Sequence, residues 1–344
     1  MFNNVPLPWL LVIYFVLTGG IVFLAKKLAD YTDALDKKTK ISGAFIGAVF
    51  LAAVTSLPEL FTSISATILL PDSADLVIGN ILGSNLFNIA ILGIAFIIFF
   101  MLIAKSNVEY KTQFITIAAI LLIYGVIAYG IMAPSGAQPI FGPINLIVIL
   151  IFGFYILAIL LQPKSKEEGE EKIDPLPKLT VKQVVLRFIL CAVLLIGISV
   201  VITYATDTLS ELIFEGDDTV AGAIFLAIAT SLPEVTSTIV LCRKGNFNAA
   251  LGDITGSCLF NFLIIGLAEF MAFKTSLLRG FSPEYDKAIL MVLLAVICFV
   301  FLFISLVIHR SLKAKEKPVT RWHYWLYVFT GIVMAAGYIV FLIL

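Results

Sequence analysis

One short polar sequence occurs twice in this chain, each time inside a long apolar stretch. Thr-Ser-Leu-Pro-Glu occupies residues 55–59 and again residues 230–234, and about half of the positions around the two copies are identical. A second block follows each copy in the same order, GNILGSNLFN at 79–88 and GDITGSCLFN at 252–261. Two matched blocks in the same order indicate an internal duplication, so the fold must be built from two related halves.

Apolar segments make up most of the rest of the chain. Of its 344 residues, 60% are hydrophobic and 13% are charged, and the 23 basic side chains balance the 23 acidic ones. Soluble domains contain about 45–50% apolar and about 25% charged residues, so this composition excludes a soluble enzyme, a disordered chain and a nucleic-acid binder. About 20 apolar residues can cross a bilayer as a helix. Ten such segments are expected, near 6–26, 41–69, 75–102, 112–132, 140–161, 184–205, 218–242, 247–272, 286–308 and 322–344.

The predicted fold class is therefore an all-α polytopic membrane protein with five helices in each half. Because five is odd, the two halves enter the membrane from opposite sides and form inverted repeats, an architecture typical of secondary transporters. We expect helices 2, 3, 7 and 8 to be interrupted near the midplane, since they contain the repeated Pro, Gly and Asn residues. The expected organisation is a first repeat at 1–161 with its motif block at 43–90, a cytoplasmic linker at 162–183, and a second repeat at 184–344 with its motif block at 222–263.

Positive charge predicts the orientation of these helices. Lys and Arg gather in the loops after the first, third, fifth, seventh and ninth segments, whereas the loops 70–75, 133–139 and 206–218 contain neither. Cytoplasmic loops carry the excess of basic residues. One loop, 273–287, contradicts the pattern. The balance predicts both termini outside the cell. The lack of a large cytoplasmic insert predicts a simple prokaryotic form, a multi-pass protein of the plasma membrane.

The repeated pentapeptide places an acid deep in each half. Glu59 and Glu234 each follow a proline, and no Lys, Arg or His lies deep in the neighbouring segments to pair with them. A carboxylate at the bilayer centre costs at least about 2.5–3.5 kcal/mol. Two adjacent carboxylates cannot both stay ionised without a compensating charge. We therefore expect a bound cation or protons between them.

The groups around the two acids are hard oxygen donors. Hydroxyls come from Thr55, Ser56, Thr230 and Ser231, and each proline frees backbone carbonyls by removing an N–H from the helix. Oxygen ligands of this kind suit Ca²⁺ and Na⁺. No His or Cys cluster favours zinc or copper.

The second blocks add side chains at a helical spacing. Ser84 and Asn88 are four residues apart, as are Ser257 and Asn261, so each pair shares one helix face. We interpret these pairs as further ligands, with Asn85 as an accessory one, although hydrogen bonding between helices is the simpler alternative. Small residues, Gly79, Gly83, Gly252 and Gly256, should allow close approach of neighbouring helices.

TSLPE followed by GNxxGSNxFN, present twice in ten segments, resembles the two α-repeats of the sodium/calcium exchanger family of cation/Ca²⁺ antiporters. The resemblance implies that Glu59 and Glu234 bind Ca²⁺ centrally, while Na⁺ ions use the same oxygens. It also implies a carbonyl ligand at Ala227, with Ala52 as its repeat partner. We expect a monomer in the lipid bilayer that is not an enzyme, uses no cofactor, and transports Ca²⁺ and Na⁺.

The chain departs from that family pattern in its second repeat. Asn261 stands where some members have Asp, Cys258 replaces an Asn, and Asp253 replaces another Asn. Asp253 is interpreted either as a helix cap or as an accessory residue in ion entry or regulation. The count of two central carboxylates predicts that three Na⁺ would leave one net positive charge, hence electrogenic transport. By the same resemblance, the missing third acid argues against K⁺ co-transport.

Three alternatives remain open at this point. In a Ca²⁺/H⁺ antiporter of the same superfamily the two glutamates would carry protons, although the hydroxyl- and amide-rich shell favours Na⁺. A cation channel usually places its filter on an oligomer axis, whereas this chain contains both halves of its site. An intramembrane enzyme would need a positioned general base, which the motif lacks.

Overall fold

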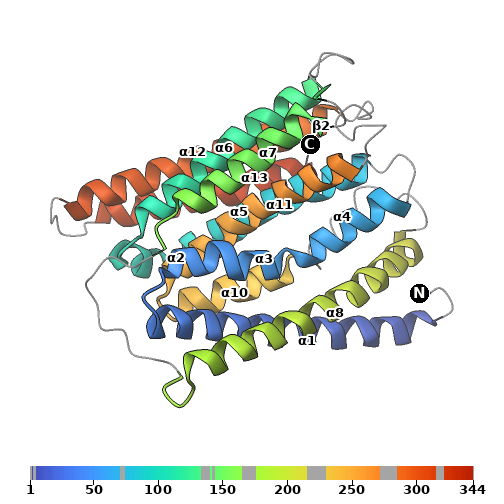
Figure 1. Ribbon diagram of the computed structural model, residues 1–344, viewed down its shortest axis with the longest axis horizontal. Coiled ribbons are helices and arrows are strands. Elements are labelled where there is room, and N and C mark those ends of the chain that lie inside the picture. The colour runs from blue at the N-terminus through green and yellow to red at the C-terminus, as the bar shows by residue number, and fades with distance from the viewer. Residues whose placement is uncertain are drawn as a thin grey trace.

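The computed structural model describes residues 2, 5–69, 74–132, 140–141, 144–164, 176–214, 230–271, 285–314 and 321–343. Long helices lying side by side form the whole body of the molecule (Figure 1). The helices are α1 (Leu7–Lys38), α2 (Gly43–Phe45), the π-helical turn η1 (Ile46–Leu51), α3 (Ala52–Thr55), α4 (Leu57–Leu69), α5 (Ala74–Lys105), α6 (Tyr110–Met132), α7 (Leu146–Leu161), α8 (Val181–Phe214), α10 (Leu232–Arg243), α11 (Phe247–Met271), α12 (Tyr285–Ala314) and α13 (Arg321–Ile343).

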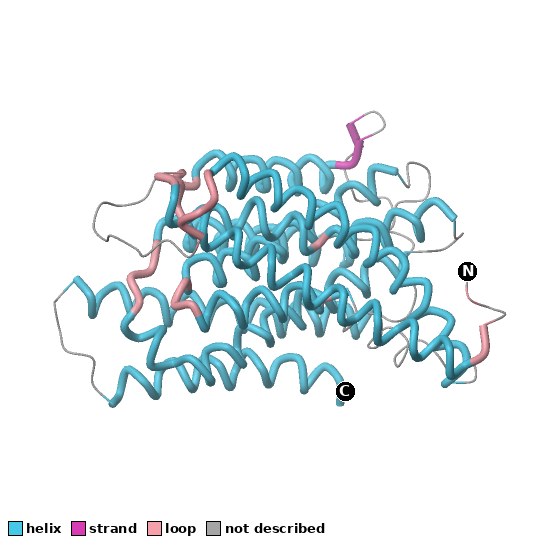
Figure 2. Tube along the Cα trace, turned by 90° about the horizontal axis from the view of Figure 1, so that it is seen from below, coloured by secondary structure: helices cyan, strands magenta, loops and turns pink. Residues whose placement is uncertain are grey.

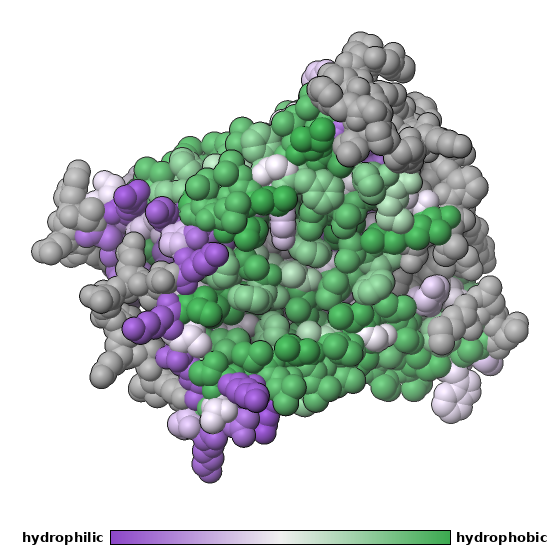
Figure 3. Space-filling view, in the orientation of Figure 1, coloured by the Kyte–Doolittle hydropathy of each residue, from purple (hydrophilic) through white to green (hydrophobic). Residues whose placement is uncertain are grey.

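The helices confirm an all-α protein of the membrane type. Among the described residues, seven helices are long and apolar enough to cross a bilayer, or eight if one bent pair counts as a single span. The shorter α7 has 16 residues. The marked chain ends both lie in the right half of the views in Figures 1 and 2. On the face shown in Figure 3, apolar side chains cover the molecule between its two ends, and hydrophilic side chains gather at the left end.

Several predicted boundaries are wrong. The first segment was expected to end near 26, but α1 continues to Lys38, so that Lys26, Lys27 and Lys37 lie on a helix and not in a loop. The fifth was expected from 140, but strands β1 (Ile140–Phe141) and β2 (Ile144–Asn145) pair there and α7 begins at Leu146. Asn145 caps that helix, because its Oδ1 accepts a hydrogen bond of 3.0 Å from the Ile147 N–H.

The second span is bent at the repeated motif. The segment Gly43–Thr55 and the segment Leu57–Ile64 meet at 42°. Ser56 lies between them with φ −89° and ψ 7°, outside the helical range. Pro58, two residues later, cannot donate to the carbonyl four residues before it, so the chain breaks here. Ser231 has the same dihedrals, φ −89° and ψ 6°. In that span, residues 215–229 lie outside the described part of the chain.

The expected interruptions of helices 3 and 8 are wrong. α11 runs without a break from Phe247 to Met271. In the described part of α5, the residue with non-helical dihedrals is Phe99, far from the motif block. The glycines of these blocks leave the helices intact. Gly252 and Gly256 serve the packing of α11, whereas a Cβ on Gly79 or Gly83 of α5 would meet no described atom within 4 Å, so the prediction of close approach is wrong for those two.

Glycine brings two backbones into direct contact at the centre of the bundle. A Cβ on Gly256 would lie 2.3 Å from the carbonyl oxygen of Ala48, and one on Gly252 would lie 2.4 Å from that of Ala44. From the other side, a Cβ on Gly47 would lie 2.3 Å from the Ala249 carbonyl oxygen. Side chains cannot fit there. The prediction of close approach is confirmed for Gly252 and Gly256, and this contact fixes the first half of span 2 against the first half of α11.

Candidate cation-binding site

Two completely buried glutamates lie at the breaks of spans 2 and 7, and each is held by the opposite repeat. Ser56 Oγ donates to Glu234 Oε1 at 3.4 Å. Ser231 Oγ donates to Glu59 Oε1, also at 3.4 Å. Because the two contacts exchange the repeats and have equal lengths, they mark a two-fold arrangement about the centre of the molecule.

The break explains why the acids can be placed there. Glu59 lies in the first turn of α4 and Glu234 in the first turn of α10. Each helix therefore directs the positive end of its dipole and its free N–H groups toward a carboxylate. Proline at the start of each helix costs no hydrogen bond, since the first N–H groups have no partner inside the helix.

Further hydroxyls surround Glu234 and Glu59. Ser257 Oγ on α11 donates to Glu234 Oε1 at 3.4 Å, and it lies 3.2 Å from Thr55 Oγ1. Thr230 hydrogen-bonds to Glu59 beside Ser231. The structure thus brings together the six hydroxyl and carboxylate residues expected of the motif, with Ser257 joined to them.

The two predicted carbonyl ligands have different outcomes. Ala52 is buried at the break, but its carbonyl oxygen already accepts hydrogen bonds from the Ser56 N–H at 3.0 Å and from Thr55 Oγ1 at 3.2 Å. Its role as a ligand remains a prediction. Ala227 lies outside the described residues.

Several buried oxygens of the predicted site have no hydrogen-bond partner among the described residues. Buried polar atoms are paired in the great majority of cases, so a group of exceptions requires an explanation. The atoms are Glu59 Oε2, Glu234 Oε2, Ser84 Oγ, Asn88 Oδ1 and Asn261 Oδ1. All belong to residues selected from the sequence as cation ligands, and oxygens of these kinds are the ligands that Na⁺ and Ca²⁺ use.

Asn85 has a different role from its neighbours. It occupies the position in the first repeat that Cys258 occupies in the second, and the two contact each other. Asn85 Nδ2 donates to the Cys258 carbonyl at 3.2 Å, while Cys258 Sγ donates to the Asn85 carbonyl at 3.7 Å. Asn85 Oδ1 accepts from Asn261 Nδ2 at 2.9 Å. Its amide therefore joins α5 to α11, as the alternative of interhelical hydrogen bonding predicted.

The helix-cap interpretation of Asp253 is wrong. α11 begins at Phe247, and the residue before it, Asn246, caps the helix by accepting from the Ala249 N–H at 3.3 Å. Asp253 is completely buried inside the helix. Its Oδ1 accepts from Thr55 Oγ1 at 3.4 Å, and its Oδ2 accepts a short hydrogen bond from Ser237 Oγ. The expected segment 247–272 already placed Asp253 inside the helix, but its burial depends on how the helices pack and could not be predicted from position along the chain.

The acids of the described residues do not form a cage around a common point. Within the described parts of the chain, no three His, Cys, Asp or Glu side chains converge to hold a metal ion. The ion pairs found there join Lys37 or Lys244 to aspartates of α1, and none reaches Glu59, Glu234 or Asp253. Any cation must therefore be bound mainly by hydroxyls, amides and carbonyls, with one or two carboxylates.

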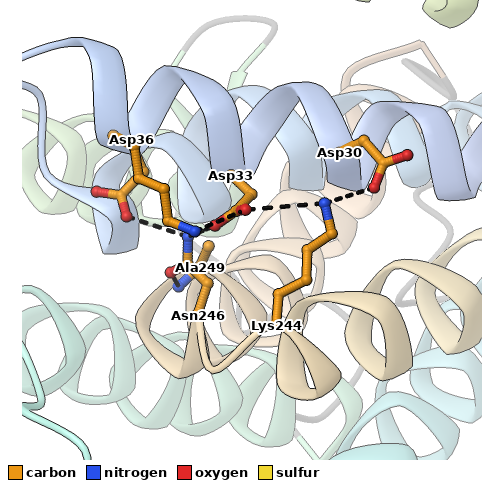
Figure 4. A network of polar contacts seen from close by, with 7 residues as sticks. Asp30, Asp33, Asp36, Lys244, Asn246 and Ala249 are labelled. Carbon is orange, nitrogen blue, oxygen red and sulfur yellow. Dashed lines mark hydrogen bonds and ion pairs between the residues drawn. The ribbon is translucent and has the colours of Figure 1, made fainter. Parts of the chain in front are cut away.

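A separate polar network, missed in the sequence, ties α1 to the turn before α11 (Figure 4). Asn246 Nδ2 donates to Asp33 Oδ1 at 2.9 Å and to Asp36 Oδ2 at 3.1 Å. Lys244 Nζ lies 2.5 Å from Asp30 Oδ1. The three aspartates follow one another at three-residue intervals, so their shared helix face was visible in the sequence. Their partners in the other repeat were not.

Together, the bundle and its buried oxygens define a multi-pass membrane protein with a polar centre suited to hard cations. A profile of the sodium/calcium exchanger protein family matches residues 9–161 and 183–344. The chain belongs to that family.

Known relatives agree with this assignment. The chain is 27% identical to the putative antiporter CaxA of Alkalimonas amylolytica, over 75% of this chain and 80% of that protein. It is 25% identical to the sodium/calcium exchanger MaX1 of Methanosarcina acetivorans, over 74% of this chain and 82% of the relative. The solved sodium-calcium exchanger NCX_Mj has the same fold, with a TM-score of 0.61 and 21% identity, covering 95% of this chain and 98% of the other.

Proposed function

We propose that this protein is a secondary-active Na⁺/Ca²⁺ antiporter that uses the Na⁺ gradient to move Ca²⁺ by alternating access. The observation that carries the proposal is the exchange of contacts between Ser56 and Glu234 and between Ser231 and Glu59. This exchange brings both acids to one buried centre, where several oxygens have no partner among the described residues. A buried pair of carboxylates without a basic partner needs a cation to stay ionised.

Coupling follows from competition for the same oxygens. Glu59 and Glu234 together neutralise one Ca²⁺, and further ligands come from the hydroxyls and amides around them. Na⁺ ions use the same groups, so that occupancy by one kind of ion excludes the other. Three Na⁺ against one Ca²⁺ would move one net charge per cycle, worth about 2.3 kcal/mol per 100 mV. We propose electrogenic, K⁺-independent exchange on this basis.

The proposed ligand set combines both repeats. The glutamates are assisted by the motif hydroxyls, by the second-block residues and by the backbone. The set is Thr55, Ser56, Glu59, Ser84, Asn88, Thr230, Ser231, Glu234, Ser257 and Asn261, with the carbonyls of Ala52 and Ala227.

We also propose a topology of ten spans as two inverted repeats, with both ends of the chain outside the cell. Support comes from the pentapeptide break at Ser56 and Ser231 and from the basic residues that end the helices on one side, Lys38, Lys105, Arg243 and Lys313. Basic residues face the cytoplasm. The plasma membrane and a monomeric state complete the proposal.

The deciding experiment is ⁴⁵Ca²⁺ uptake into proteoliposomes loaded with Na⁺ and diluted into Na⁺-free medium. Vesicles loaded with K⁺, and vesicles given a pH jump, are the controls. Uptake that requires outward Na⁺, speeds up when valinomycin with K⁺ makes the vesicle interior positive and slows when it makes the interior negative supports electrogenic exchange. Three Na⁺ leaving against one Ca²⁺ entering carry one positive charge outward. Uptake that follows the pH gradient and ignores Na⁺ overturns the proposal in favour of a Ca²⁺/H⁺ antiporter.

A further inference from the structure

A third carboxylate lies beside the central pair, and the proposed exchange does not use it. Asp253 is completely buried on α11, one turn before Ser257. It contacts hydroxyls from two other helices, Thr55 of α3 and Ser237 of α10. Ser237 Oγ also lies 3.1 Å from the Glu234 carbonyl oxygen, so Ser237 contacts both Asp253 and the backbone of a central glutamate.

In its ionised form this carboxylate needs a compensating charge. No ion pair found among the described residues reaches Asp253. Two hydroxyl donors do not offset the desolvation of a buried negative charge, which amounts to several kcal/mol. In a membrane such residues pair with another group or mark an ion pathway.

The oxygens around Asp253 are connected to those of the central site through successive contacts. Thr55 Oγ1 lies 3.4 Å from Asp253 Oδ1 and 3.2 Å from Ser257 Oγ. Ser257 in turn donates to Glu234 Oε1 at 3.4 Å, and the other oxygen of that fully buried glutamate has no partner among the described residues. Thr55 thus contacts Asp253 directly and Glu234 through Ser257, and neither carboxylate has an ion pair with a described residue.

The third acid is present on one side of the two-fold arrangement only. Its counterpart in the first repeat is Asn80, a partly exposed amide that donates to Ser63 Oγ at 3.5 Å. Asp253 is six residues from the start of α11, on the side of the basic residue Lys244, which corresponds to about 9 Å of helix. Under the proposed topology this is the cytoplasmic side of the glutamate pair.

We propose that Asp253, Thr55 and Ser237 form an additional site for a monovalent cation on the cytoplasmic side of the glutamate pair. One full charge with neutral hydroxyls matches a monovalent ion, whereas Ca²⁺ takes six to eight oxygen ligands and more charge. The proposal rests on the proposed function in taking Na⁺ as the ion and in naming the cytoplasmic side. An ion held there compensates Asp253, so the central pair keeps its charge of two for Ca²⁺.

Equilibrium ion binding tests this site without transport. The purified protein is titrated with Na⁺, and separately with Ca²⁺, while choline holds the ionic strength constant and thermal unfolding reports binding. Asp253→Asn should raise the Na⁺ midpoint by about tenfold, because an ionised ligand becomes a neutral amide. The Ca²⁺ midpoint should stay within about twofold.

Glu269→Gln is the matched control. Glu269 is also a buried acid of α11, but it lies near the far end of the helix, where Asn145 Nδ2 donates to it at 3.2 Å. Both midpoints should be unchanged in this variant. If Asp253→Asn fails to fold, Ser237→Ala keeps the charge and removes one ligand, and it should raise the Na⁺ midpoint by about threefold.

An unchanged Na⁺ midpoint in Asp253→Asn, or in Ser237→Ala where that variant is the one used, overturns the site. Equal weakening of Na⁺ and Ca²⁺ also overturns it, because Asp253 would then only support the central glutamates. These results are independent of the proposed function, which fails when the unmodified protein shows no Na⁺-driven Ca²⁺ uptake.

Discussion

Ser56 and Glu234 belong to opposite repeats, yet the serine Oγ lies 3.4 Å from Oε1 of the glutamate. The helix break at the buried Ser56 is also where the helix that carries Glu59 begins. The serine at each break therefore hydrogen-bonds to the glutamate of the opposite repeat, while the helix that begins at the break carries the glutamate of its own repeat. A change at one repeat should consequently affect ion binding at both.

The two glutamates are expected to be essential for Ca²⁺ transport. Glu59→Gln or Glu234→Gln should reduce Ca²⁺ uptake to the level of empty liposomes, because one carboxylate cannot neutralise a divalent ion. Folding should persist, since an amide buried without a cation costs less than a carboxylate. Uptake assays and size-exclusion profiles check the two parts, with Glu269→Gln as the control acid. Uptake at the unmodified rate in either variant would remove the central site.

Loss of the crossed hydroxyl contact should weaken ion binding moderately. Ser56→Ala and Ser231→Ala should each raise the Ca²⁺ concentration for half-maximal uptake by about five- to tenfold, as expected for one hydrogen bond to a charged group. Thr62→Ala is the matched control, because Thr62 Oγ1 donates within its own helix to the Pro58 carbonyl at 2.9 Å. Equal effects of all three variants would show that hydroxyl loss on these helices acts through stability.

The backbone contact between span 2 and α11 should not tolerate a methyl group. Gly256→Ala places a Cβ 2.3 Å from the Ala48 carbonyl oxygen and should cost about 1–3 kcal/mol of unfolding free energy. Gly125→Ala on α6 meets no described atom within 4 Å and should stabilise by about 0.5–1 kcal/mol. Thermal unfolding in detergent compares them. A destabilised Gly125→Ala, or an unaffected Gly256→Ala, would contradict this packing.

The network at the end of α1 should contribute to stability and not to ion binding. Asn246→Ala removes the amide that donates to both Asp33 and Asp36, and it should lower the unfolding free energy by about 2–3 kcal/mol. Adding Asp36→Asn to that variant should restore part of the loss, because one buried charge then disappears. Denaturation of the two variants tests this. A single variant as stable as the unmodified protein would show that the aspartates are satisfied without Asn246.

Much of the fold could be predicted because it depends on local sequence. The apolar stretches of the described residues were predicted correctly as helices, apart from the strands at 140–145, and Pro58 was correctly identified as a perturbation of its span. Glycine was harder to interpret. Gly252 and Gly256 could break a helix or pack it, and only the neighbouring backbone of span 2 decided that they pack. Helix ends were predicted poorly for the same reason, as at Lys38, where α1 continues past its apolar stretch along a polar surface of the bundle.

The sequence by itself determined the class of protein, the duplication and the identity of the acids, because composition and repeated residues are properties of the chain. Tertiary structure decided which atoms of the two repeats meet. Asn85 and Asn88 are indistinguishable as ligands in the sequence, yet the amide of Asn85 is used in joining α5 to α11, whereas that of Asn88 has no partner among the described residues. Asp253, for which the sequence left a helix cap or an accessory residue open, lies inside α11 as a third buried carboxylate beside the central pair. Such contacts join residues far apart in the chain, and their distances depend on how the helices pack.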